Sequence, residues 1–392
     1  MQIPISQKLT ELKQQGAYRQ RRQLGSPQDI KVIIDGKQFL SFCSNDYLGL
    51  ANDPRVCQAA KDAISHYGVG TGASQLISGY STLHASLEEQ LSEFLGYQRC
   101  VLFSSGYLAN LGVISALSSR HSLILQDRLN HASLIDAAKN ASGDLKRYHH
   151  RDTNQAQDIV NDSQSDSHLI VSDGVFSMEG SIAPIDQLHQ LKRDSNDKLI
   201  IDDAHGIGVL GLNGRGSLEH LGVDTSKVDV LIGTFGKAFG GSGAFVLSDN
   251  NTIDFLIQKA RTLIYTTAPP AALAAAATQS LNIIINEPER RQKLLNNIQY
   301  FRHAIAQTNL QLLESITAIQ TIIIGENKLA LNFSSQLERR GLLVLAIRPP
   351  TVPKNTARLR ITLSSEHTLQ QIDQLANALT EVKNSIALET KS

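Results

Sequence analysis

The chain has 392 residues, of which 41% are hydrophobic, and its 37 lysines and arginines balance 37 aspartates and glutamates. A chain of this length buries a sizeable core and is expected to form two or three domains or subdomains. With a formal net charge of zero and no basic block, it lacks the features of a protein that binds the phosphate backbone of nucleic acids.

The first residues, MQIPISQKLTELKQQGAYRQRR, contain no apolar core of a signal peptide, and no run of about 18 apolar residues follows. We therefore expect a soluble, cytosolic protein that does not bind a membrane. The three cysteines, Cys43, Cys57 and Cys100, show no CxxC spacing, which argues against a metal site or a disulfide framework. All three are expected to be reduced thiols, mostly structural.

A helix is predicted over LHASLEEQLSEFLGY, residues 83–97, because its leucines recur every four residues with charges between them and Gly96 follows. Short apolar runs that end in polar or glycine-rich turns predict strands through the middle of the chain. These runs are CVLFSS at 100–105, SLILQD at 122–127, HLIVSDG at 168–174, KLIIDD at 198–203 and VDVLIGTF at 228–235. This alternation predicts an α/β fold with a large, mainly parallel sheet.

The last third of the chain differs in character. An alanine-rich helix is predicted from TTAPPAALAAAATQSLNIII, and the proline in NEPER at 286–290 predicts a break after it. A helix, the strands QTIII, GLLVLAI and RLRITL, and a final amphipathic helix follow. Because RLRITL alternates apolar and polar residues, it is expected to be an antiparallel strand with one face in water. We therefore expect an N-terminal segment at 1–50, a large α/β domain at 51–285 and a small α+β domain at 286–392.

Two charged residues lie where predicted strands end. Asp202 follows Leu199–Ile201, and Lys237 follows DVLIGTF within GTFGKAFGGSG. The carboxyl edge of such a sheet is where open α/β folds bind ligands. A lysine amine that forms a Schiff base and a carboxylate that keeps a pyridinium protonated are the two groups that pyridoxal phosphate requires. An isolated DxxH pattern at Asp202 and His205 is more often a turn cap beside a loop histidine, so the pairing with Lys237 carries the hypothesis.

A phosphate also needs donors. Thr234, the glycines after Lys237 and SSGYLAN at 104–110 supply hydroxyls, small residues and a helix start where backbone amides can face an anion. Each of these clusters, taken singly, is equally well explained as a tight turn. His131 follows the strand SLILQD and could stack on a flat ring, although a lone loop histidine is more often structural.

Two glycine patterns offer an alternative, a dinucleotide-dependent oxidoreductase. GIGVLG at 206–211 fits GxGxxG after a strand, but LNGRGS follows and cannot begin the helix that such a site needs. GVGTGA at 68–73 follows a helical segment instead of a strand. A P-loop at Lys237 is excluded, because Leu231 stands at the first glycine position and Ala238 at the Ser or Thr position. No GxSxG nucleophile elbow is present.

Seven segments in order are similar to those of the α-oxoamine synthases, which are pyridoxal-phosphate enzymes of the aspartate-aminotransferase fold, fold type I. They are SNDYLGL, GTGASQLISGY, FSSGYLAN, LNHAS, DGVFSMEG, DDAHGIGVLG and TFGKAFGGSG. The resemblance covers nearly the whole chain. It implies an acyltransferase that joins an amino acid to an acyl thioester. It also implies a homodimer, because enzymes of this fold generally place their sites at a dimer interface.

The segment AIRPPTVPKNTARLRITL at 346–363 resembles the biotin-pathway branch of that family, which condenses L-alanine with pimeloyl-CoA or a pimeloyl-carrier protein. The glycine C-acetyltransferase and 5-aminolevulinate synthase branches remain alternatives. One departure is Gln75 in GASQLISG, where many members carry arginine. Other members of the biotin branch share this departure.

The resemblance also implies a role for each matching residue. Lys237 would form the Schiff base, Asp202 would pair with the pyridinium nitrogen and His205 with the phenolic oxygen, while His131 would stack on the ring. Ser177 and Thr234 would contact cofactor oxygens, with the backbone at Gly106 and Tyr107 near the phosphate. Arg360 would bind the amino acid carboxylate. Thr351 and Arg19 would contact substrate, although Arg21 and Arg22 lie beside Arg19 and no motif fixes the register.

Overall fold

The computed structural model describes residues 4–349 and 351–389. The chain divides into two compact units. The large unit comprises residues 48–177 and 181–292, and the small unit comprises the described residues up to Tyr47, residues 178–180 and those from Lys293 onward. The boundaries at 47/48 and 292/293 lie three and seven residues from the expected domain limits at 50/51 and 285/286. The second one falls inside a helix, α12 (Pro288–Ala306).

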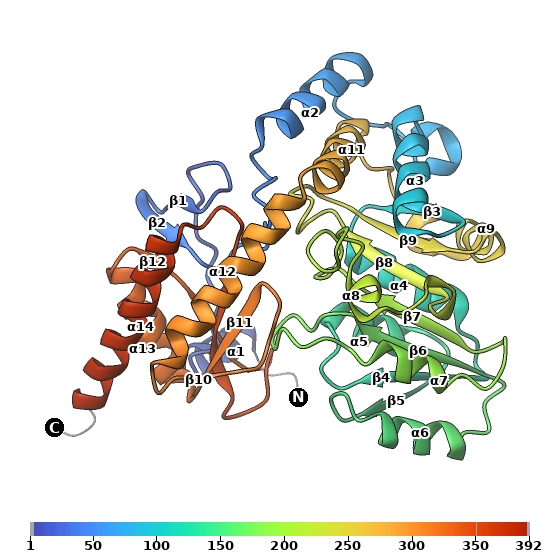
Figure 1. Ribbon diagram of the computed structural model, residues 1–392. Coiled ribbons are helices and arrows are strands. Elements are labelled where there is room, and N and C mark those ends of the chain that lie inside the picture. The colour runs from blue at the N-terminus through green and yellow to red at the C-terminus, as the bar shows by residue number, and fades with distance from the viewer. Residues whose placement is uncertain (1–3, 350, 390–392) are drawn as a thin grey trace. The chain divides into compact units, whose positions relative to one another are not determined.

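A seven-stranded sheet is the centre of the large unit (Figure 1). Its order is β3-β9-β8-β7-β6-β4-β5, and only β9 runs antiparallel to its neighbours. The strands are β3 (Arg99–Phe103), β4 (Ser122–Asp127), β5 (Asp144–Tyr148), β6 (Ser167–Asp173), β7 (Lys198–Asp202), β8 (Val230–Thr234) and β9 (Ala244–Ser248). Most are buried along nearly their whole length, as strands covered on both faces must be.

The helices of the large unit are α2 (Pro54–Tyr67), the π-helix η1 (Gln75–Gly79), α3 (Thr82–Leu95), α4 (Gly106–Leu117), α5 (Ala132–Asn140), α6 (Thr153–Asp162), α7 (Ile185–Gln190), α8 (Ser217–Leu221), the 3₁₀ turn η2 (Thr225–Lys227), α9 (Asn250–Lys259), α10 (Arg261–Ile264) and α11 (Ala271–Asn286). One apolar cluster joins α4, α5, α9 and α10 to the sheet. Elsewhere α3 packs on β3 and α11 packs on both α2 and α3. The predicted α/β architecture with a mainly parallel sheet is confirmed.

The sequence located α3 well. Leu87, Leu91 and Leu95 are buried along it, and Gly96 ends it in the left-handed conformation at φ 73°. All five predicted strands are present. The pattern missed β5 and β9, because DLKRY is an edge strand that carries charges and AFVLS directly follows the glycine-rich loop.

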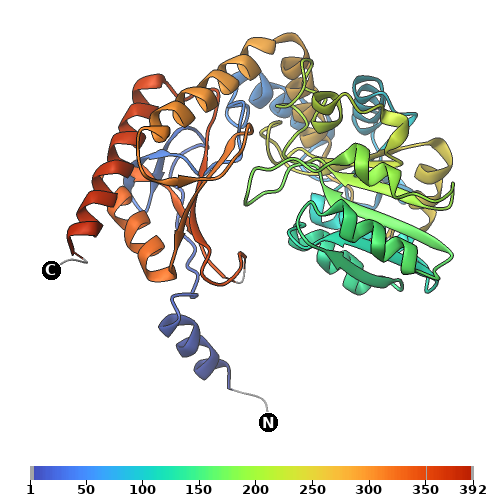
Figure 2. The same cartoon turned by 60° about the horizontal axis from the view of Figure 1, so that its bottom comes forward.

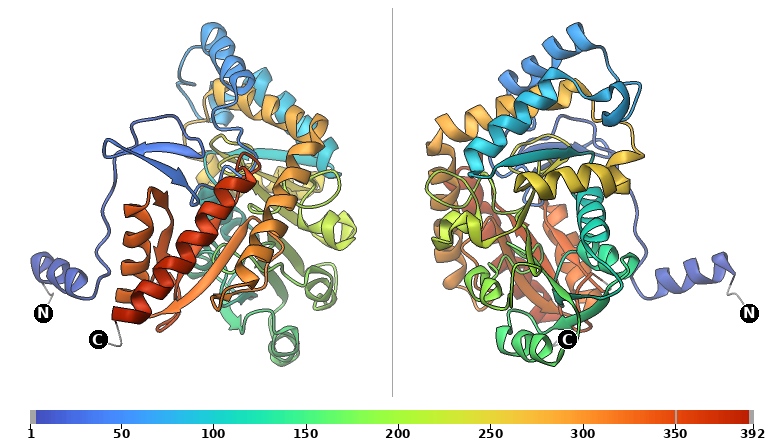
Figure 3. Two further views of the ribbon diagram at one scale, coloured as in Figure 1. Left: turned by 60° about the vertical axis from the view of Figure 1, so that its left-hand side comes forward. Right: turned by 90° about the vertical axis from the view of Figure 1, so that its right-hand side faces the viewer.

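The small unit contains two sheets. β1 (Lys31–Ile34), β2 (Lys37–Ser41) and β12 (Leu342–Leu343) form one, so the N-terminal segment pairs with the C-terminal part of the chain. β10 (Gln311–Leu312), β11 (Ile319–Gly325), β14 (Ala357–Thr362) and β13 (Leu345–Ile347) form the other, with antiparallel pairing throughout. α13 (Asn327–Arg339) packs on this second sheet with α14 (Leu369–Glu389) beside it (Figure 2). α1 (Ile5–Gln14) has no buried residue and projects from the rest of the small unit (Figure 3).

One expectation for the small unit was wrong. β14, the RLRITL strand, pairs antiparallel with β11 and β13 as expected, but it has no face in water, because all six of its residues are buried. Its two arginines are held by specific partners. Arg358 donates to Glu179 Oε1 at 2.7 Å, and Arg360 donates to Asn45 Oδ1 at 3.2 Å. The alternation in RLRITL therefore reflects a buried polar face.

Residues 178–180 belong to the small unit although they lie between β6 and α7 in sequence. Besides the Arg358–Glu179 pair, Thr321 Oγ1 donates to the carbonyl of Met178 at 2.7 Å, and Ser315 Oγ donates to that of Gly180 at 3.0 Å. The FSMEG segment is thus tied to the small unit directly after Ser177. Ser177 therefore lies at a covalent junction between the two units.

Candidate functional site

Five parallel strands of the large sheet end at the same edge, and the predicted cofactor residues follow those ends. β3 leads into Ser105–Tyr107, β4 into His131, β6 into Ser177, β7 into His205 and β8 into Lys237. β7 and β8 are adjacent parallel strands, with Asp202 opposite Ile232. The fold therefore gathers these segments at one carboxyl edge of the large unit, where such sheets bind ligands.

The two neighbouring aspartates at the end of β7 have different surroundings. Asp202 Oδ2 accepts a hydrogen bond from Asn110 Nδ2 at 2.7 Å, and Oδ1 accepts one from the Ala204 amide at 3.1 Å. Asp203 is fully buried and its Oδ2 accepts from the Ser217 amide at 2.7 Å. Burial raises the pKa of Asp203 to about 7. Asp202 is thus the carboxylate held by polar groups at the strand end, and Asp203 supports the loops around it.

Lys237 lies in a tightly packed turn after β8. The Gly240 amide donates to the Lys237 carbonyl at 2.8 Å, and the Gly241 amide donates to the Phe235 carbonyl at 2.7 Å. Gly240 has φ 65°, and a Cβ there would come within 2.2 Å of the Ala51 amide nitrogen. A side chain at Gly240 would therefore push the backbone apart. The positive charge of Lys237 is close enough to His131, Asp173 and Asp203 to help lower the pKa of each, although burial has the larger effect on all three.

His131 caps the start of α5. Its backbone amide donates to Asp173 Oδ2 at 2.6 Å, and its Nδ1 accepts from the Ser133 amide at 3.3 Å. The pKa of His131 is lowered, first because the surrounding protein removes water from the ring and then because of Lys237, while Asp202 acts in the opposite direction. Asp173 is buried, and burial together with Asp202 raises its pKa well above the usual range. His131 is therefore disposed to be neutral at physiological pH.

The N-terminus of α4 lies beside Thr234, where the sequence predicts an anion cup. Ser105 is the N-cap, and its Oγ accepts from the Leu108 amide at 3.2 Å. A Cβ built on Gly106 would lie 4.0 Å from the Thr234 Cβ, so the helix start and the end of β8 are in contact distance. The Thr234 hydroxyl accepts from the Gly236 amide at 3.1 Å and donates to the Gly243 carbonyl at 2.9 Å. Backbone amides at a helix start beside a hydroxyl suit a phosphate group.

The other predicted residues of the large unit lie in the loops of the same edge. His205 is buried in the turn after Asp202, and Ser177 is half-buried in the loop between β6 and α7. The Tyr107 side chain is exposed and donates to Asp136 Oδ2 at 2.7 Å, which leaves only its backbone for the cup. Gln75, where many family members carry arginine, donates to the Leu102 carbonyl at 2.9 Å.

Sequence reasoning missed two buried residues next to the predicted ones. Asn110 on α4 and Ser133 on α5 are each 1% exposed, and both bond to predicted site residues. The available signal was the asparagine that closes FSSGYLAN. A polar amide in an otherwise apolar helix segment indicates a buried partner.

The predicted carboxylate ligand lies in the small unit. Arg360 on β14 donates to Asn45 Oδ1, which also accepts from the Tyr47 hydroxyl at 3.2 Å. Tyr47 is buried, and burial raises its pKa to about 12. Asn45 belongs to the SNDYLGL segment, whose residues received no role from the sequence. Its amide oxygen orients the buried guanidinium of Arg360.

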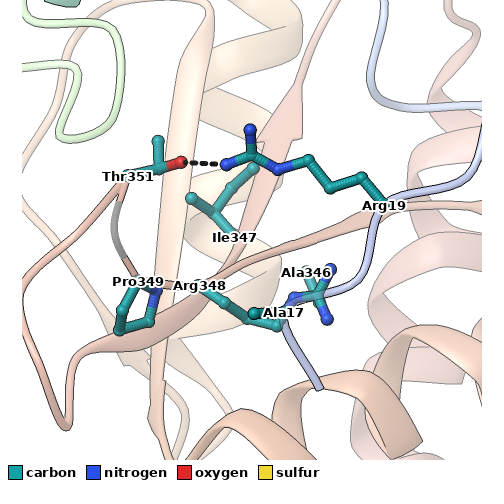
Figure 4. Close-up of a pocket in the computed structure, with 7 residues that line it drawn as sticks. All are labelled: Ala17, Arg19, Ala346, Ile347, Arg348, Pro349 and Thr351. Atoms are coloured by element: carbon teal, nitrogen blue, oxygen red, sulfur yellow. Dashed lines mark hydrogen bonds between the residues drawn. The ribbon is translucent and has the colours of Figure 1, made fainter. Parts of the chain in front are cut away.

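A pocket in the small unit contains two further predicted residues (Figure 4). It has a volume of about 80 Å³ and is lined by Ala17, Arg19, Ala346, Ile347, Arg348, Pro349 and Thr351. Arg19 donates to Thr351 Oγ1 at 3.2 Å. Arg348 donates to the Gly16 carbonyl, and its pKa is lowered by burial and by the charge of Arg19. Two guanidinium groups that repel each other make this pocket suitable for an anion.

The arginines beside Arg19 have other surroundings. Arg22 forms ion pairs with Asp35 at 2.7 Å and with Glu338 at 3.0 Å. Arg21 does not line the pocket. Arg348 was not singled out from the sequence, although it stands in the RPPT segment that was.

The dinucleotide alternative receives no support from the geometry. Gly206–Gly211 forms a series of turns in which Gly208 and Gly211 have φ 90° and 82°, and the next helix, α8, begins only at Ser217. The GxGxxG pattern therefore lacks a helix start for a pyrophosphate. GVGTGA at 68–73 follows helix α2 and not a strand.

Within residues 4–349 and 351–389, no helix has the length and apolar character needed to cross a membrane. Over the same described residues, no group of three or more His, Cys, Asp or Glu side chains is arranged to hold a metal ion. Cys43, Cys57 and Cys100 are free cysteines.

Comparison with known proteins gives consistent results. The family model described as aminotransferase class I and II matches residues 37–379. An 8-amino-7-oxononanoate synthase from Methylococcus capsulatus is 50% identical over 95% of this chain and 96% of its own length. The enzyme of the same name from Cellvibrio japonicus is 47% identical over 97% of this chain and 96% of its own.

Two solved structures show the same fold, and one of them contains PLP. Serine palmitoyltransferase from S. paucimobilis, solved with a PLP–myriocin aldimine, superposes with a TM-score of 0.92 at 27% identity over 98% of each chain. An 8-amino-7-oxononanoate synthase from Francisella tularensis superposes with a TM-score of 0.78 at 34% identity over 89% of this chain and 99% of its own. The resemblance to the PLP-dependent α-oxoamine synthases and the fold type I prediction are confirmed, and the chain belongs to the aminotransferase class I and II family.

Proposed function

We propose that this chain condenses L-alanine with pimeloyl-CoA or a pimeloyl-carrier protein, releasing CO2 and the thiol and forming 8-amino-7-oxononanoate for biotin biosynthesis. The observation that carries the proposal is the pair Asp202 and Lys237, which follow adjacent parallel strands at one sheet edge. The curated relatives of that name, 45–50% identical over nearly the whole chain, support the same reaction. An acyltransferase that uses pyridoxal phosphate needs this lysine and this carboxylate together.

The residues at the sheet edge fit pyridoxal phosphate. Lys237 supplies the amine that binds its aldehyde, and the Asp202 carboxylate supplies the charge for its ring nitrogen. The α4 start at Gly106 and Tyr107 together with Thr234 suits the phosphate, because amides and a hydroxyl meet there. When the cofactor is bound, His131 would lie against its ring, and His205 and Ser177 would bond to its oxygens.

When bound, the cofactor supplies an electron sink for the charge that develops on the Cα of alanine. The free Lys237 amine would take the α-proton of alanine, and it would later return a proton to the same carbon. Arg360, oriented by Asn45, binds the alanine carboxylate. A bond forms between Cα and the thioester carbonyl carbon, the C–S bond breaks, and the alanine carboxylate leaves as CO2.

The Arg19–Arg348 pocket binds an anionic part of the acyl substrate. The two guanidinium groups repel each other, and burial adds to the cost of the Arg348 charge. A carboxylate or phosphate between them removes this repulsion, and the Thr351 hydroxyl, which now accepts from Arg19, provides a third polar contact. Arg348 therefore joins Arg19 and Thr351 as a residue that binds the acyl substrate.

The active form is a homodimer in the cytoplasm. Val69 in the loop after α2, Ile77 on η1 and Tyr265 in the loop after α10 expose their apolar side chains by 77%, 81% and 72%. The two loops are tied together, because Thr71 Oγ1 donates to the Ala268 carbonyl at 2.8 Å and the Ala268 amide donates to the Ala73 carbonyl at 3.0 Å. Apolar side chains this exposed on adjoining loops are characteristic of a surface covered by another chain.

The first test is the visible absorption spectrum of the purified protein, before and after borohydride, followed by a free-thiol assay. We expect a yellow, borohydride-reducible chromophore and thiol release that requires both L-alanine and pimeloyl-CoA. Lys237→Ala should abolish the reducible chromophore and turnover, while Lys139→Ala, on the surface of α5, should leave both intact.

The substrates distinguish the alternatives. Thiol release with glycine and a short acyl-CoA in place of alanine and pimeloyl-CoA would assign another branch of the family. A protein that binds pyridoxal phosphate but releases no thiol with any of these pairs would contradict the proposed reaction. Normal turnover of Lys237→Ala would remove the lysine from its role.

A further inference from the structure

A continuous series of hydrogen bonds joins Asp202 to His131 through two buried side chains. Asn110 Nδ2 donates to Asp202 Oδ2 at 2.7 Å and to Ser133 Oγ at 2.8 Å. Ser133 Oγ in turn lies 2.7 Å from His131 Nδ1. The series therefore connects three strand ends of the sheet by way of α4 and α5.

The chemistry of the groups sets the direction of each bond. A carboxylate only accepts hydrogen bonds, so Asn110 must turn its NH2 group toward Asp202. The opposite orientation would place the amide oxygen against the carboxylate. Asn110 Oδ1 is buried and has no hydrogen-bond partner among the described residues. Burying an acceptor without a partner costs stability, which indicates that the asparagine is kept for its NH2 group.

The orientation of Asn110 fixes Ser133 as a hydrogen-bond donor to His131. Its oxygen already accepts from Asn110, so its single proton is directed to His131 Nδ1. The Ser133 backbone amide also donates to Nδ1, at 3.3 Å. Because two donors face Nδ1, that nitrogen must accept, and the proton of the neutral ring is on Nε2. A proton on Nδ1 would oppose both donors.

We propose that Asn110 and Ser133 are positioning residues that hold His131 as the neutral Nε2–H tautomer and fix the Asp202 carboxylate in the same network. The inference rests on the proposed function for its catalytic meaning. A neutral ring adds no second positive charge beside Lys237. Its Nε2–H remains the one ring donor that can bond to substrate, whereas the other tautomer would offer an acceptor there.

The direct test needs neither cofactor nor substrate. Histidine labelled with 13C and 15N in the ring reports its tautomer and protonation by NMR, and the His131→Gln protein identifies the His131 signals in the cofactor-free enzyme. We expect the Nε2–H form in the native protein over the neutral pH range. In Ser133→Ala we expect a tautomer mixture and a titration midpoint raised by about one unit, because one of two donors to Nδ1 is lost.

Three further variants serve as comparisons. Ser133→Thr keeps a hydroxyl and should restore the native tautomer. Asn110→Leu removes the hydrogen bond that orients the Ser133 hydroxyl, so this hydroxyl should no longer be directed only to His131. The His131 signals should then shift in the same direction as in Ser133→Ala. Ser118→Ala is the matched control, because the Ser118 hydroxyl is buried next to α4 and has no partner among the described residues. It should leave the His131 signals unchanged.

In the loaded enzyme, the acidic limb of the kcat profile should move with the NMR midpoint in Ser133→Ala. An unchanged tautomer and midpoint in both Ser133→Ala and Asn110→Leu would overturn the inference, whatever their activity. If Asn110→Leu does not fold, Ser133→Ala and Ser133→Thr test the inference without it. Shifted NMR signals in a protein without synthase activity would support the network while contradicting the proposed reaction.

Discussion

The role proposed for Asp202 requires a charged carboxylate, whereas the loop-supporting role of Asp203 does not. We expect Asp202→Asn to retain the cofactor but to lower kcat about a hundredfold. The Asp202 charge would raise the pKa of the pyridinium nitrogen by roughly one to three units. A shift of two units corresponds to about 2.7 kcal/mol, or a hundredfold in rate. The measurement is steady-state kinetics alongside the cofactor spectrum. Asp203→Asn is the control, because a carboxyl group with a pKa of about 7 is half neutral already, and it should keep most of the activity. Equal losses in the two variants would refute the assignment.

His367 makes the stability of the small unit depend on pH. It stacks on Phe42 with ring centroids 4.3 Å apart, its Nδ1 accepts from the Ser364 amide and its Nε2 lies 2.9 Å from the Ser41 carbonyl. Burial lowers the pKa of His367 to about 4, from 6.5. Below pH 6.5 the unfolded chain takes up a proton that the folded chain does not take up until about pH 4. Stability is therefore lost as the pH falls between these values, by about 3 kcal/mol.

The check is the free energy of unfolding in urea, measured from pH 7 to pH 4. His367→Gln has no ring to protonate and should lose less stability over this range than the native protein. His121→Gln, at an exposed position, should follow the native curve. Parallel curves for His367→Gln and the native protein would show that His367 does not contribute.

At the level of elements, the link between FSMEG and the small unit depends on Gly180. Its φ is 72°, and a Cβ there would lie 2.4 Å from Ser315 Oγ and 2.5 Å from the Ile319 carbonyl. We expect Gly180→Ala to destabilise the protein by about 2–4 kcal/mol, because backbone strain and overpacking add. Gly36→Ala, at φ 77° with nothing within 4 Å, isolates the backbone part and should cost about 1 kcal/mol. Equal melting temperatures in the two variants would contradict this account.

Elements were predictable where local signals agreed. α3 has apolar periodicity and a terminal glycine, and the five predicted strands are apolar runs that end in turns, so their positions followed from spacing alone. β14 shows the limit of this reasoning. The same alternation describes a strand with a wet face and one whose arginines are buried, and only Glu179 and Asn45, both distant in sequence, decide between the two.

For the whole molecule, we expect twice the 42.8 kDa chain mass in light scattering or sedimentation. Ile77→Asp places a charge on η1 beside the exposed apolar loops. It should raise the dissociation constant of the dimer tenfold or more, as expected for losing about 1.4 kcal/mol at an interface. Leu388→Asp, which changes an exposed leucine of the small unit, should leave the mass unchanged. A monomer in the native protein at micromolar concentration would contradict the homodimer.

The sequence alone determined the sheet class, the strand ends that deliver Asp202 and Lys237, and the family, because these depend on local patterns and on motifs in a fixed order. Tertiary structure decided which of two adjacent aspartates is held at the edge, which arginine beside Arg19 is committed to an ion pair, and how Asn110 and Ser133 orient His131. These features depend on contacts between residues far apart in the chain. Spacing places a residue at a strand end, but only packing selects its partners.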